Sequence, residues 1–134
     1  MMISPAFLQT AGPMREDYFL YCEEVDWCLR AVERGLRLGF EPAARVMHYT
    51  GTTTGAYDAM RERRRLPIHL SARNAVLLLR DHAPPMLPVA AFALLIQQTI
   101  KYGRHRAWRQ LGFALSGLRD GLLNRRGPLI PSTF

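Results

Sequence analysis

Three carboxylates stand within four positions of this chain, at Glu23, Glu24 and Asp26, with aromatic residues on both sides. Like charges this close repel one another, and each loses hydration when it approaches a protein wall. Such a cluster is typical of a solvated helix start, or of a site that handles protons, metal ions or sugars. The spacing alone leaves both interpretations open.

A helix is the element that must position these carboxylates. Apolar residues recur at helical spacing after Glu23, and Gly35 supplies a stop. Glu23 and Glu24 then occupy the first turn, where the helix dipole favours negative charge. Asp26 and Arg30 are four residues apart and are predicted to pair on the exposed face of the helix.

The composition limits the classes of protein to consider. The chain has 134 residues, and nearly half of them are hydrophobic, which suits one domain with a modest core and excludes disorder throughout. The chain contains no run of 18 uncharged apolar residues, so the sequence predicts no simple membrane span. Its first residues lack the features of a signal peptide. Cys22 and Cys28 fall on different faces of the predicted helix, so we expect no disulfide and a reduced, cytoplasmic setting.

The charge is unevenly distributed. Residues 1–58 carry eight acidic and five basic residues, a balance of −3, whereas residues 59–134 carry three acidic and thirteen basic ones, a balance of +10. A basic region beside an acidic one suggests an anionic partner for the basic part. Nucleic acid is the less favoured choice, because no recognition motif accompanies the arginines.

The basic half is predicted to be helical, with helices at about 68–81 and 105–123. The apolar segment at 89–100 has only about half the length needed to span a bilayer. Residues 86–126 are either an interfacial membrane element, with apolar side chains in the lipid and arginines on headgroups, or a helical region packed on another part of the protein or on a partner. The isolated histidines in this half are predicted to lie on the surface: His69, His82 and His105.

An ordered series of residues runs through the first part of the chain. It comprises the stretch from Asp17 to Arg30 (DYFLYCEEVDWCLR), then Gly35, Pro42, Ala44-Arg45-Val46, His48 and Gly51. This series resembles the acceptor-side half of family 2 glycosyltransferases, in particular the rhamnosyltransferase-like branch. The resemblance covers residues 1 to about 80 well and the segment 117–121 more loosely.

The resemblance implies an α/β fold. Residues 1–58 would be the acceptor-side part of the catalytic domain, in the C-terminal half of a GT-A fold, with short strands at 36–40 and 44–48 around one helix. Residues 59–134 would be the helical, basic C-terminal region. The resemblance also implies an inverting transfer of a sugar, such as rhamnose, from a nucleotide-sugar donor to a glycan or lipid-linked acceptor.

An inverting transfer needs a base that takes the proton of the acceptor hydroxyl as it attacks the anomeric carbon. The resemblance gives this role to Glu24, with Glu23 and Asp26 as competing candidates. It makes His48 a contact to the diphosphate or to a divalent metal, Mg²⁺ or Mn²⁺; a purely structural histidine is the alternative. The expected substrate-binding residues are Trp27, Tyr21, Arg30, Thr50, Gly51 and Thr52, although Trp27 and Tyr21 also suit a core or wall.

Two features of such enzymes are missing. The sequence contains no Asp-x-Asp motif and no leading strand-and-helix repeats for a donor-binding half. We therefore expect a C-terminal fragment that is inactive alone, located in the cytoplasm or at the inner face of the membrane, with homo-oligomers left open. The alternatives are a non-catalytic interaction module that retains the half-fold, or a basic protein that binds membrane surfaces or anionic polymers.

Overall fold

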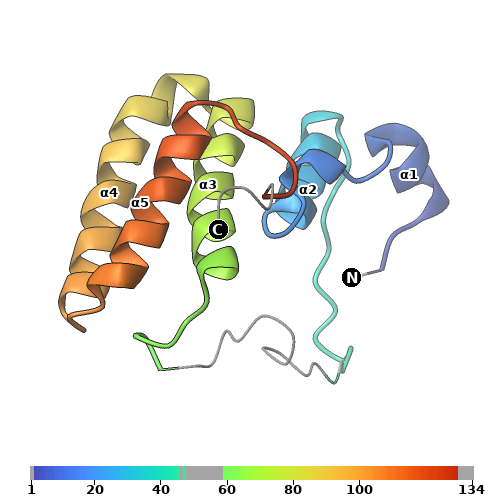
Figure 1. The fold of residues 1–134 in the computed structure, drawn as a ribbon. Coiled ribbons are helices and arrows are strands. Elements are labelled where there is room, and N and C mark those ends of the chain that lie inside the picture. The colour runs from blue at the N-terminus through green and yellow to red at the C-terminus, as the bar shows by residue number, and fades with distance from the viewer. Residues whose placement is uncertain (1, 46, 48–58, 130–134) are drawn as a thin grey trace.

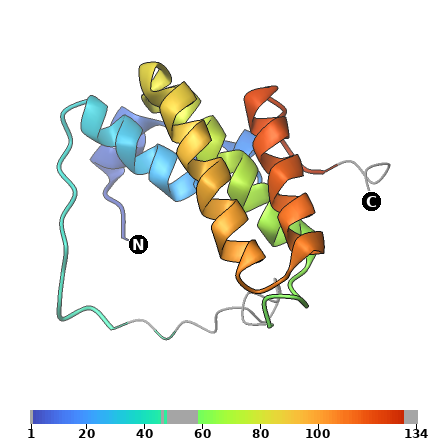
Figure 2. The same ribbon diagram turned by 90° about the vertical axis from the view of Figure 1, so that its left-hand side faces the viewer.

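The computed structural model describes residues 2–45, 47 and 59–129, and the part that it describes is built from helices (Figure 1). Three long helices lie side by side as an up-down-up bundle, and two shorter helices pack together beside it (Figures 1 and 2). The helices are α1 (Pro5–Ala11), α2 (Glu23–Glu33), α3 (Arg65–His82), α4 (Leu87–Gly103) and α5 (Trp108–Leu122), with 3₁₀ turns η1 (Glu16–Tyr18) and η2 (Pro84–Met86).

The predicted α/β fold class is wrong: residues 2–45, 47 and 59–129 contain no strand. Residues 36–40 run as isolated extended chain, with Phe40 90% exposed. A strand is stable only when a neighbour pairs with its backbone groups, and no segment among the described residues pairs with this one. In the second predicted strand, 44–48, the described residues 44, 45 and 47 are also not strand, and residues 46 and 48 lie outside the described part.

Local sequence signals mark the ends of α1 and α2, and those predicted for α2 are confirmed. Ser4 caps α1 by accepting a hydrogen bond from the backbone N–H of Phe7 at 3.2 Å, and Pro5 occupies the first helical position. Helix α2 begins at Glu23, and Gly35 follows its end with a φ of 84°, a conformation that favours glycine. Both helices are therefore encoded by their immediate sequence.

Two glycines on α5 allow α3 and α5 to pack closely against each other. A Cβ on Gly117 would lie 2.3 Å from the carbonyl oxygen of His69, and one on Gly121 would lie 2.7 Å from that of Arg73. Without these side chains, the backbones of α3 and α5 come into direct contact. The apolar core of the bundle lies around this contact and consists of Ile68, Ala72, Val76, Tyr102, Ala107, Ala114 and Leu118.

A second, smaller core joins α1 to α2. The rings of Phe7 and Trp27 meet edge to face with centroids 5.0 Å apart, and Ala11 and Ala31 complete the cluster. The indole N–H of Trp27 donates to the carbonyl oxygen of Gly12 at 2.8 Å. None of the described helices is both long and apolar enough to cross a membrane.

Candidate functional site

The three carboxylates of the acidic motif lie in three different environments at the start of α2. Asp26 is fully buried, Glu23 is half-buried and Glu24 is exposed. The three carboxylates lie within one turn, but they differ in exposure because only one side of the turn faces α3. Glu24 is the carboxylate that an approaching molecule reaches first.

Asp26 is the centre of a buried ion cluster. Its Oδ2 accepts a hydrogen bond from Arg30 Nε at 2.9 Å, and its Oδ1 lies 3.0 Å from His82 Nε2 and 3.8 Å from Arg15 Nη1. The predicted pairing of Asp26 with Arg30 is thus present, but the prediction that the pair lies on the exposed face is wrong. Asp26 is fully buried and the Arg30 side chain is only 18% exposed, because this face of α2 turns toward the C-terminal end of α3.

Arg30, predicted to contact substrate, is bound to the protein through each of its nitrogens. Besides the contact with Asp26, Nη1 donates to the carbonyl oxygen of Ala11 at 2.6 Å and Nη2 to that of Pro13 at 2.9 Å. These carbonyls belong to the end of α1 and the chain after it, where helical hydrogen bonding stops. In this structure Arg30 therefore fastens α1 to α2.

Glu23 and Glu24 remain the accessible part of the motif. Oε2 of Glu23 is buried and has no hydrogen-bond partner among the described residues. Both carboxylates lie close enough to affect Cys22, since burial and then the charges of Glu23 and Glu24 raise the pKa of its thiol to about 11. Neither Cys22 nor Cys28 is part of a disulfide.

The turn that leads into the motif has an unusual backbone. Phe19, Tyr21 and Cys22 have φ values of 66°, 71° and 70°, in the left-handed region that residues with a Cβ rarely adopt. Such strain persists only where surrounding contacts over-determine the conformation, and it concentrates at functional sites. The side chains that hold this turn come from α3.

Asn74 and Arg73 hold the turn by binding its carbonyl groups. The amide nitrogen of Asn74 lies 2.9, 2.6 and 2.8 Å from the carbonyl oxygens of Tyr18, Leu20 and Tyr21. Arg73 donates to Tyr18 O at 2.9 Å through Nη2. Arg73 and Asn74 are both buried, so this is a fixed support of the acidic motif from the middle of the bundle.

The sequence interpretation missed Arg73 and Asn74. The available signal was their position, because these two adjacent polar residues stand in the middle of the mostly apolar segment from Ile68 to Leu79, which also contains His69 and Ser71. A polar pair on the buried face of a helix must find partners, since an unpaired buried polar group is costly. The partners, however, lie more than fifty residues earlier in the chain.

Asp81, near the end of α3, accepts a second group of hydrogen bonds. It accepts hydrogen bonds from the Tyr18 hydroxyl at 2.8 Å, from Arg15 at 2.9 Å and from both terminal nitrogens of Arg126 at 2.9 and 2.6 Å. Burial alone would raise the pKa of Asp81, but the hydrogen bonds from Arg126 and Tyr18 bring it below the ordinary value. The chain after α5 is thereby tied back to the segment before the acidic motif.

The two aromatic residues predicted to contact sugar differ in position. Trp27 is 6% exposed and packs against Phe7, so its ring faces the small core. Tyr21 is half-buried and lines a cavity of about 170 Å³ between the start of α3 and the end of α4, which Arg63 and Lys101 also line. The structure therefore brings Tyr21, but not the ring of Trp27, to an open surface.

The remaining predicted site residues, His48, Thr50, Gly51 and Thr52, lie outside the described residues. Within the described ranges, no three or more histidine, cysteine, aspartate or glutamate side chains come together in a way that could hold a metal ion. The expectation of a Mg²⁺ or Mn²⁺ site at His48 stays a prediction.

Two histidines predicted to lie on the surface are in fact engaged. His69 is 1% exposed; its Nδ1 lies 2.9 Å from Ser116 Oγ and its Nε2 lies 3.2 Å from Asp120 Oδ2. The set of Ser116, His69 and Asp120 has the residue types of a hydrolytic triad. However, the Ser116 hydroxyl donates to the carbonyl oxygen of Phe113 and the imidazole is enclosed between helices, so the set locks α3 to α5 and presents no nucleophile.

The other engaged histidine is His82, whose Nδ1 and Nε2 lie 2.7 Å from Glu33 and 3.0 Å from Asp26. The prediction of a surface position is wrong for both histidines for one reason. Each finds its carboxylate on another helix, and periodicity along one segment contains no information about that neighbour.

Comparisons with known proteins reveal partial similarity to sugar transferases. Rhamnosyltransferase WbbL of Escherichia coli is 47% identical over 34 residues, which is 25% of this chain and 13% of the relative. The dTDP-rhamnosyl transferase RfbF of Shigella flexneri is 28% identical over 92 residues, 64% of this chain and 30% of the relative. No family model and no solved structure matches. The chain thus spans less than a third of the curated relatives it matches, and this distant similarity indicates a role related to glycosyl transfer.

Proposed function

We propose that the intact protein carrying this chain is a family 2 glycosyltransferase that transfers rhamnose, and that Glu24 is its general base. The observation that carries the assignment is the separation of the three carboxylates: Asp26 is buried in ion pairs, whereas Glu24 is exposed at the first turn of α2. The partial similarity to two rhamnosyltransferases supports the class of reaction.

The proposed step follows from the position of Glu24. Its carboxylate accepts the proton of an acceptor hydroxyl while that oxygen forms a bond to the anomeric carbon of the donor sugar. The bond from this carbon to the diphosphate oxygen breaks, and its electron pair leaves with the nucleotide diphosphate. The donor is proposed to be dTDP-rhamnose, from the name of the Shigella relative, and the acceptor a glycan or a lipid-linked sugar.

Asp26 and Arg30 have positioning roles in this proposal. They fix α2 against α1 and α3 through the buried pair, and Arg73 and Asn74 fix the turn in front of Glu24. A base must be held within hydrogen-bond reach of the proton that it abstracts. The proposed metal contact, His48, lies outside the described residues, and the described ones form no metal site.

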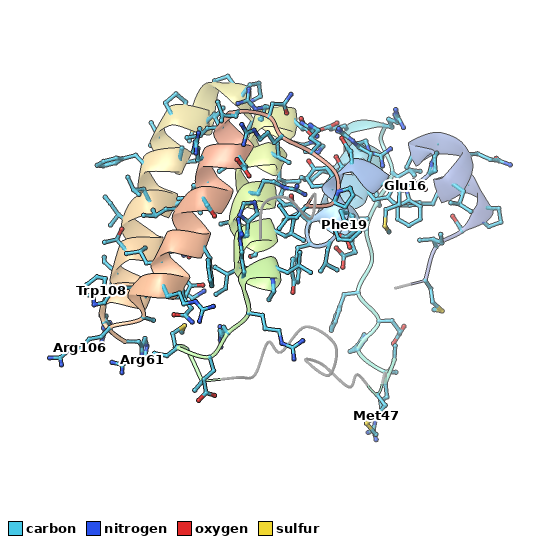
Figure 3. All side chains as sticks on the ribbon, viewed as in Figure 1. Glu16, Phe19, Met47, Arg61, Arg106 and Trp108 are labelled. Carbon is cyan, nitrogen blue, oxygen red and sulfur yellow. The ribbon has the colours of Figure 1, made fainter. Side chains whose placement is uncertain are left out.

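The test is Glu24→Gln in the intact protein, with rhamnose transfer from dTDP-rhamnose as the readout. Loss of the base is expected to lower turnover by about a hundredfold or more, with little change in KM. Glu16→Gln is the matched control, because Glu16 is also exposed and lies on η1 before the motif (Figure 3). If Glu24→Gln retains full turnover and Glu23→Gln abolishes it, the base is Glu23 instead.

A non-catalytic interaction module is the second candidate. The observation in its favour is the large apolar surface that α4 and α5 leave exposed. The same experiment separates the two functions. A catalytic protein loses transfer on changing one carboxylate of the motif, whereas a module shows no transfer from the donor with any variant.

A further inference from the structure

Helices α4 and α5 expose an unusual amount of apolar surface on the side away from α3. Phe92 is 64% exposed, Ile100 53% and Trp108 64%. A shallow apolar hollow of about 660 Å³ runs between the two helices. We use the name α4–α5 face for these exposed side chains, which are Val89, Phe92, Leu95, Ile96, Ile100, Trp108, Leu115, Leu122 and Leu123.

Helix α4 is apolar around most of its circumference. From Leu87 to Ile100 it has no charged residue, and Tyr102 is its only buried residue. A helix that is apolar on every side is normally enclosed, in a protein core or in a membrane. In this structure α4 has α5 on one flank and only limited contact with α3, so the α4–α5 face needs a non-aqueous environment.

The charges around this face are predominantly positive. Residues 89–123 contain one acidic residue, Asp120, whose carboxylate lies 3.2 Å from His69 Nε2 on α3. Their basic residues are Lys101, Arg104, Arg106, Arg109 and Arg119, and the first four cluster where the chain turns from α4 into α5. Figure 3 shows Arg106 and Trp108 at this end of the bundle, with Arg61 close to them; Arg61 Nε donates to the carbonyl oxygen of His105 at 2.8 Å.

We propose that the α4–α5 face binds the surface of an anionic lipid membrane, with α4 and α5 lying in the plane of the interface. The apolar side chains would enter the boundary of the acyl chains, and the arginines of the turn would contact lipid phosphates. Trp108 lies beside those arginines, and tryptophan favours the level of the headgroups. This proposal does not depend on the proposed sugar transfer.

Two observations favour a lipid surface over an acidic protein partner. A protein groove takes up one stripe of a single helix, whereas the exposed apolar residues of this face come from two neighbouring helices, with Phe92 and Ile96 on α4 and Leu122 on α5. Four of the five basic residues are also gathered at one end instead of alternating with the apolar ones; the fifth, Arg119, lines the hollow near the end of α5. That separation suits insertion of the apolar side chains into the lipid, with the basic side chains on the phosphates at the edge of the inserted face.

The experiment is co-sedimentation of the purified chain with phosphatidylcholine vesicles, with and without phosphatidylglycerol, at low and high salt. We expect binding to the anionic vesicles at low salt, and weaker binding at high salt or without phosphatidylglycerol. Absence of binding to anionic vesicles at low salt overturns the proposal. Equal binding to both kinds of vesicle contradicts the role of the arginines.

Charge reversal tests the place of contact. Arg104→Glu with Arg106→Glu is expected to weaken binding by about tenfold or more, since each basic residue near the surface contributes about 1 kcal/mol. The matched control is Arg37→Glu with Arg45→Glu, two exposed arginines before α3 that change the net charge equally. If both pairs weaken binding equally, attraction by net charge explains the result and the proposed face is wrong.

Insertion is tested separately. Phe92→Asp is expected to reduce binding by about tenfold or more, while Phe40→Asp, also at an exposed position, is expected to leave it unchanged. Brominated lipid should quench the emission of Trp108, and Trp108→Phe should remove the quenched signal because Trp27 is buried. Quenching that persists in Trp108→Phe, or binding that survives Phe92→Asp, contradicts insertion of this face.

Discussion

The side-chain amide of Asn74 lies 2.8 Å from the carbonyl oxygen of Tyr21, a residue whose φ is 71°. This contact links the middle of α3 to the strained turn immediately before Glu23 and Glu24. An asparagine can offer two N–H donors to a cluster of carbonyls, which few other side chains of its size can do. The orientation of the acidic motif therefore depends on a residue fifty positions later in the sequence.

Asn74→Asp is expected to destabilise the fold and loosen the turn. The substitution keeps the shape but replaces the donors by a carboxylate that faces three carbonyl oxygens in a fully buried position. We expect a loss of about 3 kcal/mol or more in the free energy of unfolding. Urea unfolding measures this loss, and hydrogen exchange should show faster exchange at residues 19–26.

The matched control for this change is Asn124→Asp. Asn124 is exposed, and its Oδ1 accepts from Arg126 Nε at 2.9 Å, a role that a carboxylate can also fill. We expect its stability to stay within about 0.5 kcal/mol of the original chain. Similar stabilities for the two variants would show that the turn does not need the amide of Asn74.

The glycines of α5 make a second prediction. In Gly117→Ala, the new Cβ would lie 2.3 Å from the carbonyl oxygen of His69, so α3 and α5 must move apart. The contact of His69 with Ser116 and Asp120 would be lost together with core packing. We expect a destabilisation of roughly 2–4 kcal/mol, measured by thermal and urea unfolding.

Gly112→Ala is the control on the same helix. Nothing lies within 4 Å of a Cβ placed at Gly112, so the substitution adds helix propensity without a clash. We expect it to stabilise the protein by roughly 0.5–1 kcal/mol. A destabilising Gly112→Ala, or a neutral Gly117→Ala, would contradict the observed packing of α5 on α3.

Sequence reasoning predicted the structural features that depend on neighbouring residues. It failed for features that depend on contacts between segments far apart in the chain. The start of α2 at Glu23 depends on a few neighbouring residues, and this prediction is confirmed. The strand predicted at 36–40 depended on a pairing partner that the described chain does not supply. Periodicity found the pair of Asp26 and Arg30, but it could not show that α3 covers it.

The charge of His82 makes a prediction about pH. Burial lowers the pKa of His82, but the hydrogen bonds to Glu33 and Asp26 outweigh this and raise the pKa above its ordinary value. Its contribution to stability is therefore fully present below a pH of about 6.5 and is lost as the pH rises through the raised pKa. The stability difference between the original chain and His82→Gln should be larger at about pH 5 than at about pH 9.

His69 should show the opposite dependence on pH. Burial is the main reason that the pKa of His69 is lowered, although the charge of Asp120 partly opposes it. A base with a depressed pKa stabilises the fold when neutral, and that contribution falls as the pH drops below about 6.5. The difference between the original chain and His69→Gln should therefore be larger at about pH 9 than at about pH 5. If the stability difference changes with pH in the same direction for both histidine variants, one of the two assignments is wrong, and the sign of the change shows which.

Arg126 makes the last prediction, because it ties the chain after α5 to the segment before the acidic motif. It binds Asp81 through two nitrogens and Asp17 through one, and the N–H of Gly127 donates to Asp17 O at 2.6 Å. In Arg126→Gln we expect faster hydrogen exchange at Gly127 and a loss of roughly 1–3 kcal/mol in unfolding free energy. Arg125→Gln is the control, since the Arg125 side chain is 58% exposed and its pair with Asp120 should contribute less than about 1 kcal/mol. Protection at Gly127 that survives Arg126→Gln would show that backbone contacts alone hold the tail, and that the charge network around Asp81 does not position the segment leading into α2.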